Sequence, residues 1–277
     1  MHYISLCAIV KDEHPNNLQE FIAHHLGIGI EHCYIYDNGS SIPISNILKN
    51  YIDAGLVSVI YFPEKGVQMQ AYSGCLNAFG KDNEFIAFID MDELIIPKSH
   101  DNMQDFLRQY NSLLHLGSFA INWKIFGSEI NGELAITKPN QLMSEIYIKS
   151  SNNEFEENKH IKSIVRPKNT KFFNLDPHHA TLHNGYFNYN EKMQNIRGPF
   201  AQPCSTETIQ INHYFTRSKE EWEKKVLKGR ADVSDSNIPG REIHEWESFN
   251  NNCNMIEDCS ALRFVNKTKE IMEKYRC

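Results

Sequence analysis

The stretch "FIAFIDMDELIIP", residues 85–97, decides the fold class because it joins a strand-like run to a group of acids. Phe85 to Ile89 form an unbroken apolar run, as expected of a strand covered on both faces of a parallel sheet. Asp90, Asp92 and Glu93 follow at once. Ligands of open α/β sheets bind at the carboxyl ends of the strands, so these carboxylates are expected at a binding edge.

The first half of the chain alternates short apolar runs with amphipathic ones, which is typical of βαβ units. We expect further buried strands at residues 4–10, 33–36 and 57–62, and helices at residues 14–29, 44–52 and 69–79. The pattern predicts an α/β fold with a mostly parallel, Rossmann-like central sheet flanked by helices.

The second half has a different composition. Residues 150–158 are polar and acidic, and the chain after them is rich in Asn, His, Pro and aromatic residues, so we expect a long loop there. Ser218 and Glu221 have the spacing of a capping box, which predicts a helix start. The last 20 residues are expected to form one more helix. A loop-rich C-terminal half is therefore predicted to complete the site.

Composition restricts the class of protein. The chain has 277 residues, 41% of them hydrophobic, and a formal net charge of -7. It lacks a dense basic stripe, which argues against a nucleic-acid partner. No apolar run approaches the roughly 20 residues of a membrane span, and the first residues do not resemble a signal peptide. Seven cysteines without a Cys-x-x-Cys pair suggest reduced, mostly buried thiols. We expect a cytoplasmic protein with at most peripheral membrane contact.

The acids at the end of the predicted strand suit a metal. Asp90 and Asp92 can turn toward one hard cation, and such oxygen ligands fit Mg²⁺ or Mn²⁺ bound to a diphosphate. The alternative is that Asp simply favours the turn after a strand. Three acids within four positions favour the metal site.

A second acidic strand end follows residues 33–36, where the sequence continues as "DNGS". Here a carboxylate could accept hydrogen bonds from a ribose or a uracil ring, which makes Asp37 and Asn38 candidates for donor binding. The same residues are common in turns, and both interpretations stay open. Neither Gly-x-Gly-x-x-Gly nor a P-loop pattern occurs, which excludes Rossmann dehydrogenases and P-loop NTPases.

These segments together resemble the GT-A glycosyltransferases of family 92 and their bacterial relatives in the family-2-like group. The resemblance extends roughly from Cys7 to Gly229. It rests on eight blocks in the expected order: "CAIVKDE" (7–13), "EFIAHHLGIGIEHCYIYDNGS" (20–40), "FIDMDELIIP" (88–97), "NWKIFGS" (122–128), "KSIVRP" (162–167), "DPHHA" (176–180), "INHYFTRSKEEWEKK" (211–225) and "KGRAD" (228–232). Asp12 stands where the family has Asn in its Lys-Asn-Glu.

The resemblance implies one GT-A domain over residues 1–277, with a nucleotide-sugar-binding half at 1–125 and an acceptor-binding half with the C-terminal helices at 126–277. It implies inverting transfer of a hexose, galactose before others, from a UDP-sugar. The acceptor would be a hydroxyl of a glycan or of a lipid-linked saccharide. Mn²⁺ or Mg²⁺ would assist. A sugar nucleotidyltransferase and a noncatalytic glycan-binding module remain alternatives.

The resemblance also implies roles for individual residues. Metal ligands would be Asp90 and Asp92, with His213 or His178 as a further ligand. Inversion needs a carboxylate that takes the acceptor's proton, and Asp232 and Glu129 are both candidates. The donor-binding candidates are Lys11, Glu13, Asp37, Asn38, Gln70, Asp90, Lys162, Arg166 and Arg230. The acceptor-binding candidates are Trp123, Phe126 and Tyr214, for which core packing is the alternative.

Overall fold

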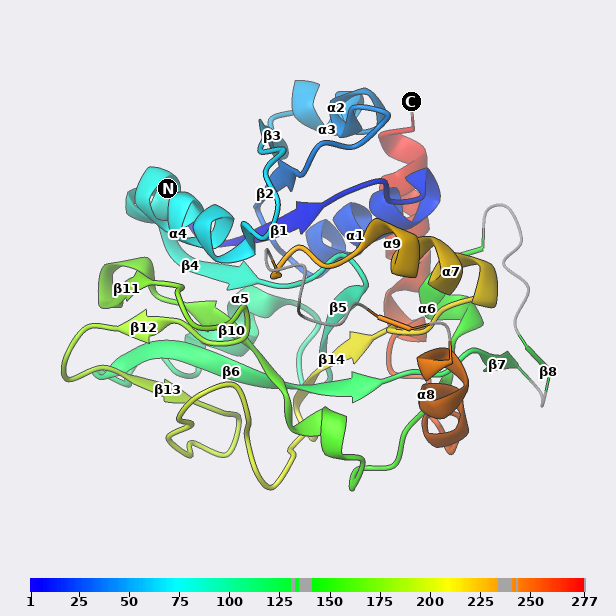
Figure 1. Cartoon of the computed structure of the whole chain (residues 1–277). Helices are drawn as coiled ribbons and strands as arrows, with labels where there is room; N and C mark the ends of the chain where they lie inside the picture. The colour runs from blue at the N-terminus through cyan, green and yellow to red at the C-terminus, as the bar shows by residue number, and fades with distance from the viewer. Residues whose placement is uncertain (131–132, 135–140, 234–240, 243, 277) are drawn as a thin grey trace.

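The computed structural model describes residues 1–130, 133–134, 141–233, 241–242 and 244–276. Within these ranges one nine-stranded sheet dominates, in the order β3-β2-β1-β4-β10-β6-β14-β5, and β13 pairs with β6 (Figure 1). Its strands are β1 (His2–Val10), β2 (His32–Asp37), β3 (Val57–Tyr61), β4 (Asn83–Phe88), β5 (Glu93–Pro97), β6 (Leu116–Ile125), β10 (Ile161–Val165), β13 (Phe187–Tyr189) and β14 (Ile209–His213).

Strand direction decides which residues meet at the edge of the sheet. Strands β1 to β4 run parallel, and β13 and β14 run parallel to β6. Strand β10 is antiparallel to both β4 and β6, and β5 is antiparallel to β14. The carboxyl ends of β4, β6 and β14 therefore share one edge with the amino ends of β5 and β10. The α/β fold is confirmed, and the sheet is mixed but mostly parallel.

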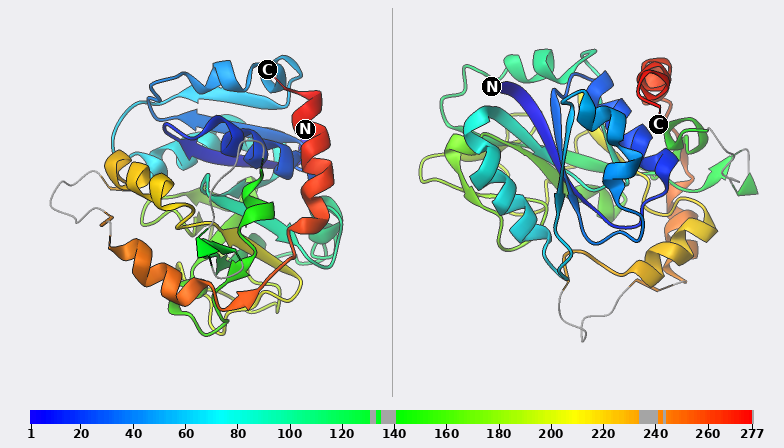
Figure 2. Two further views of the ribbon diagram at one scale, coloured as in Figure 1. Left: turned by 90° about the vertical axis from the view of Figure 1, so that its right-hand side faces the viewer. Right: turned by 90° about the horizontal axis from the view of Figure 1, so that it is seen from above.

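Helices cover both faces of the parallel part. Figure 2 shows α4 (Gln68–Phe79) on one side of the sheet, and α1 (Pro15–Gly27) with α9 (Leu262–Lys274) on the other. Leu6 and Ala8 of β1 join the core on the α1 side, whereas Cys7 and Ile9 join the core on the α4 side. Because successive side chains of a strand point to opposite faces, an unbroken apolar run is required here.

The remaining elements are short. The helical pattern expected at residues 44–52 forms two pieces that divide at Leu48. Ser218 and Glu221 form the expected capping box at the start of α7 (Lys219–Lys228). The other elements are α2 (Ile44–Ile47), α3 (Lys49–Asp53), α5 (Met103–Arg108), α6 (Met143–Ile146), α8 (Glu245–Cys253), β7 (Glu129–Ile130), β8 (Glu133–Leu134), β9 (Lys149–Ser150), β11 (Thr170–Phe172), β12 (Thr181–Leu182), β15 (Ile256–Glu257), and the 3₁₀ turns η1 (Gly80–Asp82), η2 (Glu156–Lys159) and η3 (Pro167–Asn169).

The second half is loop-rich between η3 and β14, as expected, but it also contributes strands to the main sheet that were not expected. Strands β10 and β14 lie in the interior of the sheet, and Ile164, Ile209 and Ile211 on them join the same core cluster as residues of the first half. The sequence of β10, "IKSIV", contains Lys162 and Ser163, and both side chains are buried. Buried polar residues interrupt the apolar pattern by which an interior strand is recognised.

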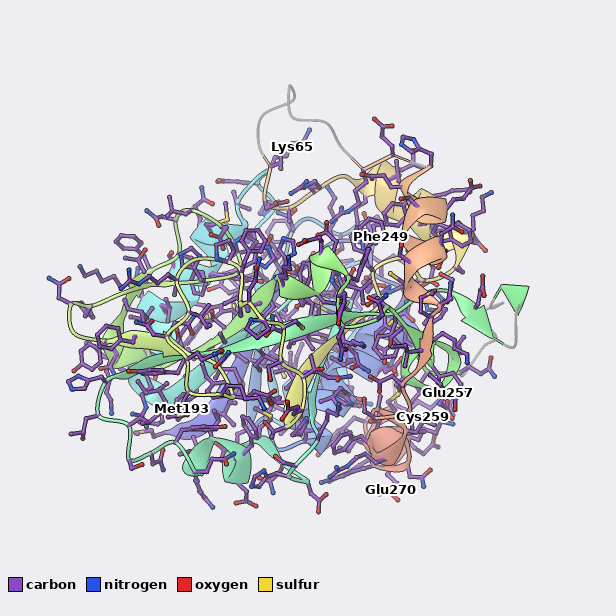
Figure 3. All side chains as sticks on the ribbon, turned by 90° about the horizontal axis from the view of Figure 1, so that it is seen from below. Lys65, Met193, Phe249, Glu257, Cys259 and Glu270 are labelled. Atoms are coloured by element: carbon purple, nitrogen blue, oxygen red, sulfur yellow. The ribbon has the colours of Figure 1, made fainter. Side chains whose placement is uncertain are left out.

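The cysteines agree with the expectation of free thiols. The six cysteines in the described ranges are free, and Cys7, Cys33, Cys75 and Cys253 are buried. Cys259 is exposed beside Glu257 (Figure 3). Among the described helices we find none whose length and apolar character would suffice to cross a membrane.

Candidate active site

The predicted acidic residues lie where the strand ends meet. Asp90 comes two residues after the end of β4, and Glu93 begins β5. His213 ends β14 and pairs in register with Glu93, while Lys162 is the second residue of the antiparallel strand β10. We call Asp90, Asp92 and Glu93 the acidic cluster. The mixed sheet brings side chains from four strands or strand ends to it.

Asp90 is held by three neighbours. Its Oδ2 lies 2.7 Å from Lys162 Nζ, and its Oδ1 accepts hydrogen bonds from Gln68 Nε2 at 2.6 Å and from the Tyr72 hydroxyl at 3.3 Å. Burial raises the pKa of Asp90, but the ammonium of Lys162 outweighs it and the pKa is lowered. Asp90 is therefore a carboxylate of fixed orientation whose side chain remains 31% exposed.

Asp92 has a different set of partners. Lys225 Nζ, from α7, lies 2.5 Å from its Oδ2, and His213 Nε2 lies 3.6 Å from the same oxygen. Burial opposes ionisation of Asp92, but Lys225 and His213 hold its pKa well below the usual range. Burial also lowers the pKa of Lys225 to about 8, even though Asp92 favours its charged form.

Glu93 is the buried member of the acidic cluster. Its side chain is fully buried, and its Oε2 accepts a hydrogen bond from the Asp90 backbone N–H at 2.8 Å. Its Oε1 has no hydrogen-bond partner among the described residues and lies 3.8 Å from Lys162 Nζ. Burial raises the pKa of Glu93 well above its usual range, which favours the neutral carboxyl. Glu93 thus fixes the turn that presents Asp90.

Glu13 reaches the cluster indirectly. Its carboxylate accepts a hydrogen bond from Arg217 Nη1 at 2.7 Å, and Arg217 Nη2 donates to the carbonyl of Met91 at 3.2 Å. Both side chains of this ion pair are at most 9% exposed. Glu13 therefore pairs with the arginine that donates to the Asp90–Asp92 turn, and its predicted contact with the donor stays a prediction.

The other donor-binding candidates near the strand ends have varied positions. Lys11 follows β1 and is partly buried. Asp37 caps its own turn, accepting from the N–H groups of Ser40 and Ile44, and Asn38 donates to the carbonyls of Phe62 and Glu64. The turn reading of "DNGS" thus describes these side chains. Gln70 is exposed on α4, and it is Gln68 that contacts Asp90.

Arg166 is separated from the site. It follows β10 at the end that pairs with the start of β4, and its guanidinium lies 3.1 Å from Glu84 and 4.8 Å from the Phe85 ring. This is the opposite edge of the sheet from Asp90. Because β10 has only five residues, Lys162 and Arg166 lie at opposite ends of it, and its antiparallel direction places the Lys162 end beside Asp90. Arg166 therefore lies away from the acidic cluster, whereas Lys162 lies beside Asp90.

The two candidate bases differ in position. Asp232 is paired with Arg230 at 2.6 Å, and the adjacent carbonyl of Ala231 accepts a hydrogen bond from the backbone of Gln68. The Arg230 pair outweighs burial and lowers the pKa of Asp232. Glu129 instead begins β7, where its N–H donates to Asn254, and Figure 1 shows this hairpin beside α8. The structure brings Asp232, rather than Glu129, close to the acidic cluster.

All three aromatic candidates belong to the hydrophobic core, and two of them are almost completely buried. Phe126 and Tyr214 are each 1% exposed and pack against each other with ring centroids 5.2 Å apart. Buried faces cannot stack on a sugar, so their predicted acceptor role is wrong for this structure. Trp123 is 9% exposed. Its ring centroid lies 4.7, 5.1 and 4.3 Å from the ring centroids of His160, His178 and His213.

The metal prediction can be tested against the donor atoms. No group of three or more His, Cys, Asp or Glu side chains is assembled as a cation site in the part of the chain that the structure describes. Asp92 and His213 do face each other, and carboxylate oxygen with imidazole nitrogen fits Mn²⁺. The Lys225 ammonium lies at the same carboxylate oxygen. His178 directs Nδ1 to the Ile161 carbonyl, and burial lowers its pKa to about 3. Asp92 and His213 thus supply two donor atoms of the kinds that bind such a cation, and the Lys225 ammonium contacts one of them.

Comparisons with known proteins identify a family for this chain. A family model described as Glycosyltransferase family 92 matches residues 2–239. Two curated family 92 proteins are similar: one from Oryza sativa subsp. japonica is 27% identical over 128 residues, and one from Ricinus communis is 30% identical over 129 residues. Each alignment covers 46% of this chain, but only 22% and 23% of the relatives. The chain therefore spans less than a quarter of their length.

Among solved structures, S. aureus TarS residues 1–349 in complex with UDP is 14% identical. The similarity covers 60% of this chain and 47% of that one, with a TM-score of 0.38. A likeness this low supports no conclusion about the site. The family match is different, because it extends over most of the sequence and includes the acidic cluster. The protein belongs to glycosyltransferase family 92.

Proposed function

We propose that the protein is a metal-dependent, inverting glycosyltransferase. It moves a hexose, galactose before others, from a UDP-sugar to a hydroxyl of a glycan or lipid-linked saccharide. One observation carries the proposal: Asp90 and Asp92 follow β4 at the carboxyl edge of the sheet, each held by an internal cation. Family membership supports the reaction class.

The donor diphosphate is the group that this charge arrangement suits. Asp90, Asp92 and His213 would hold Mn²⁺ or Mg²⁺, which supplies Lewis-acid stabilisation of phosphate oxygens when bound. Lys225 and Arg230 add positive charge from the chain itself, and charges placed in advance favour a departing anion.

Asp232 is the residue we assign to the acceptor proton. Its carboxylate is 22% exposed and is close enough to Asp90 for that carboxylate to act on the pKa of Asp232. A general base must reach the hydroxyl from which it takes a proton. Arg230 holds Asp232 ionised, and release of that ion pair leaves the carboxylate free to accept.

Calorimetric titration of UDP, with and without Mn²⁺, tests the proposal. We expect binding that requires Mn²⁺, followed by slow hydrolysis of one UDP-sugar in a panel. Asp92→Asn should abolish both, whereas Asp53→Asn should change neither, because Asp53 pairs with Lys49 in an exposed position on α3. Release of pyrophosphate from a nucleoside triphosphate and a sugar phosphate in the presence of the metal, without turnover of any UDP-sugar, would support the nucleotidyltransferase. Saccharide binding without nucleotide binding would support the glycan-binding module.

A further inference from the structure

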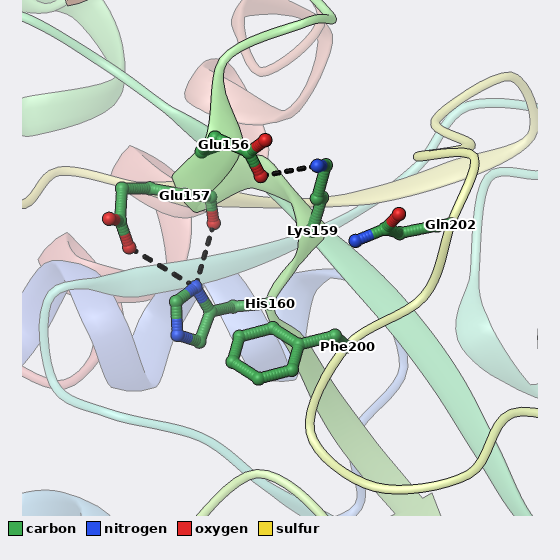
Figure 4. A pocket seen from close by; sticks show the side chains of 6 residues that line it. All are labelled: Glu156, Glu157, Lys159, His160, Phe200 and Gln202. Carbon is green, nitrogen blue, oxygen red and sulfur yellow. Dashed lines mark hydrogen bonds and ion pairs between the residues drawn. The ribbon is translucent and has the colours of Figure 1, made fainter.

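A cavity of about 310 Å³ opens beside His160 (Figure 4). We call it the His160 pocket, and its lining consists of Glu156, Glu157, Lys159, His160, Phe200 and Gln202. Main-chain contacts fix its walls: Ala201 N–H donates to the Lys159 carbonyl at 2.8 Å, and Ile161 N–H donates to the Pro199 carbonyl at 3.0 Å. The volume is at the lower end of the range for ligand pockets, roughly 300–1,000 Å³. The pocket is thus preformed.

The lining offers an apolar face and several hydrogen-bonding groups. The Phe200 ring is 49% exposed and meets the His160 ring edge-on, with centroids 4.6 Å apart. Glu156 pairs with Lys159, and the Glu157 carboxylate lies 3.3 Å from His160 Nδ1. A sugar ring presents C–H groups on one face and hydroxyls around its edge. An exposed aromatic ring beside carboxylates and an ammonium matches both parts.

The pocket also lies near the acidic cluster. The His160 ring stacks on Trp123 at 4.7 Å with an interplanar angle of 26°. Trp123 in turn contacts His213 at 4.3 Å, and His213 lies 3.6 Å from Asp92. Two rings therefore separate the His160 pocket from the residue on which the proposed donor site depends. None of the lining residues belongs to the proposed donor site, so a saccharide bound in the pocket leaves the donor-site residues unoccupied.

We propose that the His160 pocket is an acceptor subsite that binds a neutral saccharide unit. The inference rests on the proposed function, because an acceptor requires a transferase. Two carboxylates and one ammonium line the pocket, so a uronic acid or a phosphorylated sugar is disfavoured by charge.

Saturation-transfer NMR on the full chain tests this subsite. The probes are methyl β-galactoside, lactose, cellobiose and N-acetylglucosamine, with glucuronic acid as the acidic probe, all without nucleotide or metal. We expect at least one neutral probe to bind and glucuronic acid not to bind. Phe200→Ala should weaken binding roughly fivefold or more, because it removes the stacking face. Glu157→Gln should also weaken it, and Phe172→Ala, which alters a ring of similar exposure on β11, should not.

UDP binding with Mn²⁺, measured on the same variants, separates this inference from the proposed function. Unchanged UDP binding in Phe200→Ala with lost saccharide binding supports an acceptor subsite. Failure of every neutral probe to bind, or equal binding by wild type and Phe200→Ala, overturns it. Saccharide binding by a wild-type protein that does not bind UDP overturns the acceptor role and the proposed function together.

Discussion

The ammonium of Lys225 lies 2.5 Å from the carboxylate of Asp92, although 133 positions of sequence separate them. Helix α7 brings the lysine to the strand edge, where Lys225 also donates to the carbonyl of Phe215 at 2.8 Å. Both side chains are less than one fifth exposed. Asp92, which we propose as a metal ligand, is thus already paired with the ammonium of Lys225.

Lys225→Met should strengthen the binding of Mn²⁺ alone. The ammonium and the divalent ion compete for the same carboxylate, so removing the ammonium should raise affinity roughly tenfold, equivalent to about 1.4 kcal/mol. Calorimetric titration of Mn²⁺ without nucleotide measures this. Donor turnover should fall in the same variant, because the departing diphosphate loses a positive charge.

Lys224→Met is the matched control, since Lys224 is the preceding residue of α7 and pairs with Glu220 in an exposed position. It should leave both measurements unchanged. Equal Mn²⁺ affinity in Lys225→Met and wild type would contradict competition at Asp92.

Lys162 predicts a rescue experiment. Lys162→Met leaves Asp90 and the fully buried Glu93 without their shared cation, which should cost about 3–5 kcal/mol of unfolding free energy. Adding Glu93→Gln should recover part of that loss, because it removes the more deeply buried carboxyl group. Urea denaturation of both variants measures the two values.

Glu93→Gln alone supplies the reference for this pair. The raised pKa of Glu93 favours the neutral form that glutamine resembles, so its cost should be much smaller than that of Lys162→Met. A double variant no more stable than Lys162→Met would show that Glu93 does not depend on the lysine.

The elements that could be predicted from sequence are those with one strong periodic signal. Phe85 to Ile89 is apolar throughout, and the strand and its acidic end were both identified. Strand β10 was missed because Lys162 and Ser163 are polar yet buried. Their burial depends on partners from other strands, which no local pattern contains.

The site shows the same division. Asp90 and Asp92 follow their strand directly, but Gln68 and Arg217 approach from helix and loop segments without a distinguishing motif. Arg166 was placed wrongly because strand direction, unknown from sequence, decides which end of β10 meets Asp90. Chain spacing could identify the acids but not their partners.

Asp232→Asn should distinguish the two candidate bases. If Asp232 takes the acceptor proton, its amide should lower the transfer rate constant about 10²-fold or more while UDP and Mn²⁺ binding stay unchanged. Glu129→Gln should retain the rate, because Glu129 begins β7 beside Asn254. Both variants are compared by single-turnover kinetics. Full activity of Asp232→Asn with an inactive Glu129→Gln would reverse the assignment.

His24 predicts a contribution to acid sensitivity. Its Nε2 lies 2.9 Å from the carbonyl of Ile95, and burial lowers its pKa from 6.5 to about 4. Between these values the unfolded chain binds a proton that the folded chain does not, so stability falls as the pH drops through this window. The limiting loss is about 3 kcal/mol. Glu20 acts in the opposite direction, since burial raises its pKa to about 7.

The comparison between wild type and His24→Gln isolates the histidine from Glu20, because glutamine can keep the donor to Ile95 and does not titrate. Urea denaturation at pH 7 and pH 4.5 should show a smaller acid loss in His24→Gln than in wild type. His244→Gln changes an exposed histidine and should follow wild type. An equal loss in all three proteins would mean that His24 is protonated in the folded state at no extra cost in free energy. The buried imidazole would then not contribute to the loss of stability at acid pH.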